Sequence, residues 1–113
     1  MTWRSERDSI PQGTLDMLIL TTLAARKEMH GFEIADSILE QSESVLQVEE
    51  GSLYPALQRL LAEGWITGEW GRTEGNRRAR YYRLTSTGKK QLARERAKYE
   101  RVSRAIGRIL QLT

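Results

Sequence analysis

The sequence predicts a mainly helical α+β protein with one small β-hairpin. Three observations carry this prediction: helical periodicity in successive segments, two strand-like segments around a turn-forming sequence, and a long charged helical segment at the C-terminal end. The chain has 113 residues, which favours one compact unit. A chain of this size buries only about two-thirds of its unfolded surface, so a dimer would stabilise it.

The first helix is expected over residues 12–29, because apolar residues recur there at helical spacing. One face carries Leu15, Leu18, Ile19 and Leu23. Met17 and Leu20 make a second side apolar, and a helix that is apolar nearly all round is buried on two sides. In so small a protein, we expect the second side to contact another subunit.

The second helix is expected over residues 30–42, with His30 as a structural residue at its start. Its predicted core-facing residues are Phe32, Ala35, Ile38 and Leu39. Residues 44–48 (SVLQV) are rich in branched residues and favour a short extended segment.

The third helix is expected over residues 52–63, with Ser52 as its N-cap. This start places Pro55 in the first turn, where backbone N–H groups have no intrahelical partner and proline is tolerated. Gly64 suits the left-handed position that ends a helix, and Trp65 can then fold back on the last turn. The inward face of this helix is formed by Leu53, Leu57, Leu60 and Leu61.

A hairpin and a long helix complete the prediction. Residues 66–71 and 78–84 are rich in aromatic and branched residues, and the segment between them contains Gly75 and Asn76, which tolerate positive φ. Thr85 or Ser86 caps a final helix that runs to about residue 112. Its apolar seam has heptad-like spacing and is formed by Leu92, Tyr99, Val102, Ile106 and Ile109. The seam could pack on its own domain, but a helix about 40 Å long favours an intersubunit contact.

Composition excludes several function classes. The chain has no cysteine and one histidine, so disulfides, thiol nucleophiles and a two-histidine metal site are excluded, and no phosphate-cradling GxxxxGK[ST] motif occurs. We therefore expect no enzyme, no metal and no cofactor. No apolar run is long enough to cross a membrane, and the charged start does not resemble a signal peptide, so a cytoplasmic protein is expected.

Charge is distributed unevenly along the chain. Residues 1–71 hold five Lys/Arg and twelve Asp/Glu, for a net charge of −7, whereas residues 72–113 hold thirteen and three, for a net charge of +10. Such an asymmetry favours nucleic acid as a partner. A solvated basic helix is the alternative explanation.

The order helix, helix, short strand, helix, hairpin is that of a winged helix-turn-helix, in which the third helix enters the DNA major groove and the hairpin lies beside the phosphates. With the leucines inward, Pro55, Gln58 and Arg59 face outward and Tyr54 lies on the flank. Gln58 can pair with adenine, Arg59 can reach guanine or a phosphate, and Ser52 and Tyr54 suit phosphate oxygens. The hairpin adds a basic cluster that suits phosphates, although it could also be an ordinary charged surface: Arg72, Arg77, Arg78 and Arg80.

Four segments together resemble the PadR family of bacterial transcriptional regulators. They are PQGTLDMLIL (11–20), HGFEI (30–34), EGSLYPALQRLLAEGWI (50–66) and RRARYYRLTSTG (77–88). The resemblance implies a homodimeric winged-helix repressor whose C-terminal helix dimerises against the first helix of its partner, and whose residues equivalent to Tyr54 and the hairpin arginines approach DNA. It also implies release from DNA by a small aromatic or drug-like effector. The chain is similar to the short form of the family, with one terminal helix.

These observations lead to one functional hypothesis and one alternative. Residues 1–85 form a winged-helix DNA-binding domain whose first helix also contributes to the dimer, and residues 86–113 form a dimerisation helix. The protein binds double-stranded DNA at an inverted-repeat operator as a homodimer and regulates transcription, as a repressor. The alternative is a winged-helix module that binds an acidic protein. Candidates to line an effector cavity, or simply to pack in the interface, are Trp3, Met17, Leu20 and Tyr99.

Overall fold

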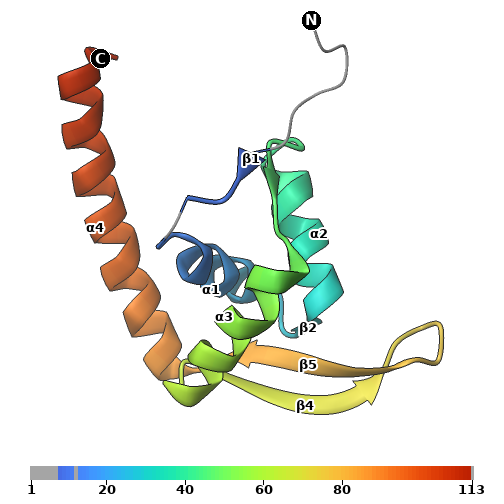
Figure 1. Ribbon diagram of the computed structural model, residues 1–113. Helices are drawn as coiled ribbons and strands as arrows, with labels where there is room; N and C mark the ends of the chain where they lie inside the picture. Colours follow the sequence, from blue (N-terminus) through green and yellow to red (C-terminus); the bar gives the residue numbers. More distant parts are fainter. Residues whose placement is uncertain (1–7, 12, 113) are drawn as a thin grey trace, which may run out of the picture.

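Three short helices pack against a small antiparallel sheet, and a fourth, longer helix extends to one side (Figure 1). The computed structural model describes residues 8–11 and 13–112. Its elements, in chain order, are β1 (Asp8–Ser9), α1 (Leu15–Ala25), β2 (Met29–His30), α2 (Gly31–Gln41), β3 (Leu46–Gln47), α3 (Glu50–Ala62), β4 (Ile66–Arg72), β5 (Arg78–Leu84) and α4 (Ser86–Leu110). The mainly helical α+β prediction is confirmed.

The core lies where α1, α2 and α3 meet the inner face of the sheet. Its fully buried side chains are Ile19, Leu20, Leu23, Met29, Ile34, Leu57, Leu60 and Ile66. The leucines of α3 point inward as their spacing predicted, and Ala56 joins them. Helix α1 is shorter than the predicted 12–29, and its Leu20 lies wholly within this core rather than on a surface open to another subunit.

Helix α2 begins with a reciprocal cap. His30 Nδ1 accepts a hydrogen bond from the Glu33 backbone N–H, and a Glu33 carboxylate oxygen accepts one from the His30 N–H at 3.1 Å. The predicted structural role of His30 is confirmed. The prediction that Phe32 faces the core is wrong, because Phe32 is 75% exposed. Ile34 and Ile38 form the buried face, and at about 100° per residue Phe32 lies on the opposite side of the helix.

Helix α3 begins three residues earlier than predicted, counted from its N-cap. Glu49 is its N-cap, and the Glu49 carbonyl accepts the N–H groups of Ser52 and Leu53, so Ser52 lies inside the helix and the prediction that it caps the helix is wrong. The prediction that Pro55 lies in the first turn is also wrong, because Pro55 is the sixth helical residue. Its missing N–H leaves the Gly51 carbonyl without the usual bond four residues on.

The end of α3 matches the prediction. Gly64 has φ +77°, its N–H donates to the Leu61 carbonyl, and the Trp65 N–H donates to the Leu60 carbonyl, both at 3.0 Å. This pair of bonds is the Schellman arrangement, which satisfies carbonyls that the last turn would otherwise leave free.

The sheet has the strand order β2-β5-β4, and all its pairs are antiparallel. Strands β4 and β5 form the predicted hairpin, and their register runs from Ile66 opposite Leu84 to Arg72 opposite Arg78. Asn76 takes the positive φ at its tip. The third strand is Met29–His30, which the sequence analysis had assigned to helical segments. Of the predicted extended segment 44–48, only Leu46–Gln47 forms a strand, β3, which pairs with β1 in a separate parallel ladder. The prediction is wrong for Ser44, which lies in the preceding turn with φ 66°.

Helix α4 has buried residues only near its start. Thr85 caps it: the Thr85 hydroxyl accepts the Gly88 N–H at 2.9 Å and donates to the Gly64 carbonyl at 2.7 Å. Leu92 is 7% exposed and belongs to the domain's own core. Beyond Leu92, Tyr99, Val102, Ile106 and Ile109 are exposed, and the last turns of the helix extend away from the other elements (Figure 1). None of the helices in residues 8–11 and 13–112 is both long and apolar enough to cross a membrane.

Candidate nucleic-acid interface

A groove of about 660 Å³ separates helix α3 and the start of α2 from the hairpin. It is lined by His30, Gly31, Phe32, Tyr54, Gln58, Trp70, Thr73, Arg77, Arg78, Ala79, Arg80 and Tyr82. Among these described residues there are three arginines and no carboxylate. A concave surface with one sign of charge attracts a polyanion more strongly than the net charge of the protein would.

The helical wall of the groove presents Tyr54 and Gln58. These two residues are four apart and therefore lie on the same side of α3, and both are exposed. The Tyr54 ring lies over the start of α2, where a β-carbon at position 31 would stand 3.3 Å from Tyr54 Cε1. Gly31 thus lets α3 and α2 share one continuous wall.

The hairpin wall presents Arg77, Arg78 and Arg80. The Arg78 guanidinium lies 4.4 Å from the centroid of the exposed Trp70 ring, a cation–π contact that holds it in place. Arg80 lies deeper. Its Nε is enclosed, has no hydrogen-bond partner among residues 8–11 and 13–112, and would stand 2.7 Å from a β-carbon at position 68. Gly68 therefore makes room for the Arg80 side chain.

Burial alters one ionisable group at the floor of the groove. Desolvation raises the pKa of the Tyr82 hydroxyl above its ordinary value of 10.0, and the positive charge of Arg80 opposes this shift. Tyr82 is therefore neutral at physiological pH, and the groove keeps the positive charge of its arginines.

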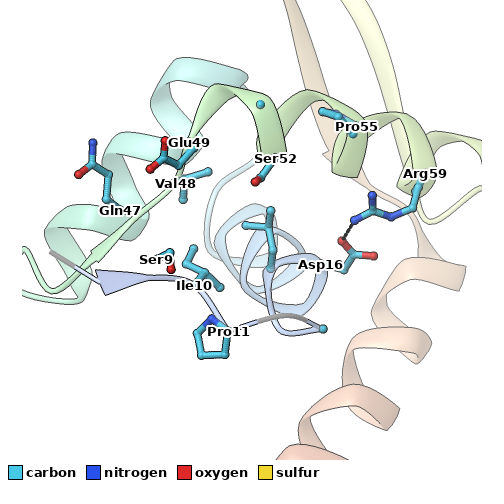
Figure 2. Close-up of a pocket in the computed structure, with 13 residues that line it drawn as sticks. Ser9, Ile10, Pro11, Asp16, Gln47, Val48, Glu49, Ser52, Pro55 and Arg59 are labelled. Carbon is cyan, nitrogen blue, oxygen red and sulfur yellow. Dashed lines mark hydrogen bonds and ion pairs between the residues drawn. The ribbon is translucent and has the colours of Figure 1, made fainter.

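The remaining predicted DNA-contact residues lie outside this groove. Arg72 is exposed, and its Nη1 donates to the Asn76 carbonyl at 3.1 Å across the hairpin turn. Ser52, Pro55 and Arg59 line a second cavity of about 640 Å³ between α3, the start of α1 and the β1–β3 ladder (Figure 2).

Arg59 is not free in this second cavity. Its Nη2 forms an ion pair with Asp16 Oδ1 at 2.8 Å, although the Arg59 side chain is 58% exposed (Figure 2). The sequence pattern had placed Arg59 on the outward face of α3 but gave no sign of this partner. The predicted outward face of α3 is therefore divided: Tyr54 and Gln58 belong to the groove, whereas Ser52, Pro55 and Arg59 belong to the second cavity.

Seven lining residues of the groove were not predicted to contact DNA: His30, Gly31, Phe32, Trp70, Thr73, Ala79 and Tyr82. Counting 100° per residue from Ile34 and Ile38 would have placed Phe32 outward. The alternation of the hairpin strands gave no comparable signal for Trp70, because which face of a hairpin meets a helix is decided by tertiary packing.

A third, shallower groove of about 260 Å³ lies between α1 and α4. It is lined by Gly13, Thr14, Met17, Glu95, Lys98, Tyr99 and Val102. Two of the four predicted effector-cavity residues, Met17 and Tyr99, meet here. Leu20 does not, because it lies in the core, and Trp3 lies outside the described residues. In the part of the chain that the structure describes, no group of three or more His, Cys, Asp or Glu residues could hold a metal ion.

Comparison with known proteins identifies the chain. A family model described as the transcriptional regulator PadR-like family matches residues 19–94. The chain belongs to the PadR family. It is a transcriptional regulator of that family, whose members are non-enzymatic DNA-binding proteins and typically dimerise.

Individual PadR relatives and solved structures agree with this assignment. The chain is 35% identical over 83 residues to transcriptional regulator Rv3488 of Mycobacterium tuberculosis, with 74% of each chain covered. A transcriptional regulator from Clostridium thermocellum has a TM-score of 0.78 at 29% identity, with 86% of this chain and 93% of that chain covered. A PadR family regulator from Clostridium difficile has a TM-score of 0.73 at 29% identity, with 87% and 99% covered. The predicted winged-helix fold is confirmed.

Proposed function

We propose that this PadR regulator binds an inverted-repeat operator as a twofold homodimer in the cytoplasm and acts there as a repressor. The observation that carries the proposal is the groove between α3 and the hairpin, which has three arginines and no carboxylate among its lining residues. Phosphates of a duplex that enters this groove replace water around the arginines and release counterions, which supplies affinity without sequence preference.

Sequence discrimination comes from α3. In a winged helix this element enters the major groove, and Gln58 lies exposed at its centre. A glutamine amide can donate to and accept from adenine at the same time, which no other base edge permits equally well. Tyr54, one turn earlier, offers its hydroxyl to a phosphate at the edge of the groove.

The remaining predicted DNA-contact residues divide into two groups. Arg77, Arg78 and Arg80 contact phosphates from the hairpin, with Arg72 beside the turn at its tip. On the other side of α3, Ser52, Pro55 and Arg59 face the opposite backbone. Arg59 can exchange Asp16 for a phosphate at little cost, because an exposed ion pair contributes only about 0–1 kcal/mol.

Helix α4 supplies the dimer contact in this proposal. Tyr99, Val102, Ile106 and Ile109 follow one another at three- and four-residue spacing, so they form one apolar stripe that the domain itself leaves exposed. We divide the chain into a DNA-binding unit, residues 1–85, and a dimerisation helix, residues 86–113. Leu92 is left out of the interface because it packs in the core. Each copy of the dimer contacts one operator half-site. The centres of the two half-sites then lie about 34 Å apart, or a multiple of this distance.

A small aromatic or drug-like effector would bind the groove between α1 and α4. Met17 and Val102 give this groove apolar walls, and Tyr99 provides a flat ring against which an aromatic molecule can stack. A ligand in this groove touches the apolar stripe of α4 that is used for dimerisation. Its binding would change the distance between the α3 helices of the two protomers.

The proposal is tested by binding to the DNA upstream of the protein's own gene at several salt concentrations. Gln58→Ala should lose about 10- to 100-fold in affinity for the specific site and little for random DNA, as loss of one bidentate base contact does. Arg77→Ala should weaken binding to the specific site and to random DNA alike, and should reduce the slope of log affinity against log salt concentration by about one. Gln41→Ala, an exposed glutamine of α2 outside the groove, is the matched control and should bind like wild type.

Two results would contradict the proposal. Equal retention of specific and random DNA at every salt concentration would remove the sequence-reading role. Strong binding to an acidic protein, together with no binding to DNA at low salt, would favour the alternative of a winged-helix interaction module.

A further inference from the structure

We infer that Phe32, at the start of α2, reads a thymine methyl group and so makes α2 a second sequence-reading element. This inference rests on the proposed DNA-binding function and deepens it, since Phe32 belongs to neither the third helix nor the basic hairpin.

The exposure of Phe32 needs an explanation. Its side chain is 75% exposed, and it is the second residue of a helix whose buried face is formed by Ile34 and Ile38. Phe32 is thus absent from the core that the described residues form. An aromatic side chain left in water forgoes the free energy that its burial would contribute, so a partner that covers it gains that free energy on binding.

The position of Phe32 shows what that partner meets. Phe32 lines the same groove as Tyr54 and Gln58. Gly31 lets the Tyr54 ring lie against the start of α2, with a β-carbon at position 31 only 3.3 Å from the tyrosine hydroxyl oxygen. The wall that carries the base-reading Gln58 therefore continues onto Phe32, and a ligand held by one reaches the other.

The chemistry of the groove limits which part of a DNA duplex Phe32 can contact. Three arginines without a carboxylate among the described lining residues favour a polyanion over an apolar protein surface. Phe32 has no hydrogen-bonding atom in its side chain, so it cannot recognise a phosphate or a polar base edge. In the major groove the one apolar group on a base edge is the C5-methyl of thymine. A deoxyribose is the other apolar surface of DNA, but the arginines on the opposite wall are the residues suited to the backbone.

The test removes that methyl group from the DNA. In the site protected by the wild-type protein, each thymine is replaced in turn by deoxyuridine, which keeps base pairing and lacks only the methyl. Wild type should lose about fourfold in affinity at one thymine of each half-site, the factor that corresponds to burial of one methyl-sized group. Phe32→Ala should bind the unmodified site more weakly and should show no further loss at that thymine. Val45→Ala, an exposed apolar residue outside the groove, should keep the wild-type uracil profile.

Other results overturn the inference. Identical uracil profiles for wild type and Phe32→Ala would exclude methyl reading by Phe32. A uniform loss of affinity in Phe32→Ala for every sequence, without a uracil effect, would assign the side chain to a deoxyribose instead. A wild-type protein that protects no DNA site would overturn the proposed function, and this inference with it. Circular dichroism and thermal melting of Phe32→Ala check the fold, which an exposed side chain should leave intact.

Discussion

Replacing Gly88 by alanine should lower the free energy of unfolding by about 2–4 kcal/mol. Gly88 lies in the first turn of α4, where this helix leaves the sheet. A β-carbon there would stand 2.1 Å from the Trp65 carbonyl oxygen and 2.8 Å from Leu84 Cδ1. Both distances are well inside van der Waals contact, and the nearer atom belongs to the backbone, which cannot rotate away.

The magnitude follows from the contacts that must shift. The Trp65 carbonyl also accepts the Thr85 N–H at 3.0 Å, and the Thr85 hydroxyl caps α4 at the Gly88 N–H at 2.9 Å. Overpacking costs about 1–3 kcal/mol, and each weakened hydrogen bond costs about 1 kcal/mol. The helix propensity of alanine over glycine returns about 1 kcal/mol.

The assay is urea unfolding followed by circular dichroism, at one protein concentration because a dimer's stability depends on concentration. Gly51→Ala is the matched control, because Gly51 is also helical but, unlike Gly88, is exposed. A β-carbon at position 51 meets nothing within 4 Å, so this variant should be slightly more stable than wild type. A Gly88→Ala midpoint equal to or above that of wild type would refute the argument that the contact with Trp65 requires glycine.

Three further outcomes are expected from the same structure. Val102→Glu should convert a dimer to monomers in light scattering, because it places a charge in the exposed apolar stripe of α4. Arg101→Glu changes a residue outside the stripe and should leave the dimer intact. An unchanged mass for Val102→Glu would contradict the proposed interface. Gly68→Ala should weaken DNA binding while leaving the melting temperature near that of wild type, because the new β-carbon would stand 2.7 Å from Arg80 Nε and displace a side chain rather than backbone. Equal DNA affinity would show that Arg80 does not depend on this space. Because burial raises the pKa of Tyr82, the folded protein keeps a proton that the unfolded chain loses, so the free energy of unfolding should fall as pH rises above 10.0. Tyr82→Phe should remove the contribution of Tyr82 to this fall, as measured by urea unfolding at several pH values.

Local sequence patterns predicted most of the helices and the hairpin, because local interactions decide where these elements form. The inward leucines of α3 and the glycine at its end follow from helical periodicity and from the preference of Gly64 for positive φ. The start of α3 was misplaced because Ser52 is a good N-cap residue in isolation, whereas the chain leaving β3 already turns at Glu49. Likewise, Met29–His30 is too short for a strand pattern, and its extended form depends on the partner strand β5.

The candidate site was predicted in part for the same reason. Tyr54 and Gln58 share one side of α3 by spacing alone, and the arginines of the hairpin are close in sequence. The ion pair between Arg59 and Asp16 joins residues 43 positions apart, so no local pattern could indicate it. The exposure of Phe32 was within reach of sequence reasoning, but its hydrophobicity outweighed its position on the helix.

The missing amide of Pro55 has a consequence for the motion of α3. The Gly51 carbonyl lies in the first turn of this helix and finds no N–H four residues on, at Pro55. The first turn is therefore joined to the rest by one hydrogen bond fewer than in an uninterrupted helix. Leu57 and Leu60 anchor the later turns in the core, whereas the turn before Pro55 is held mainly by Leu53. Amide hydrogen exchange should therefore be faster at residues 52–54 than at residues 57–60. The first turn can then adjust its backbone while the later turns, with Gln58, remain fixed to the core.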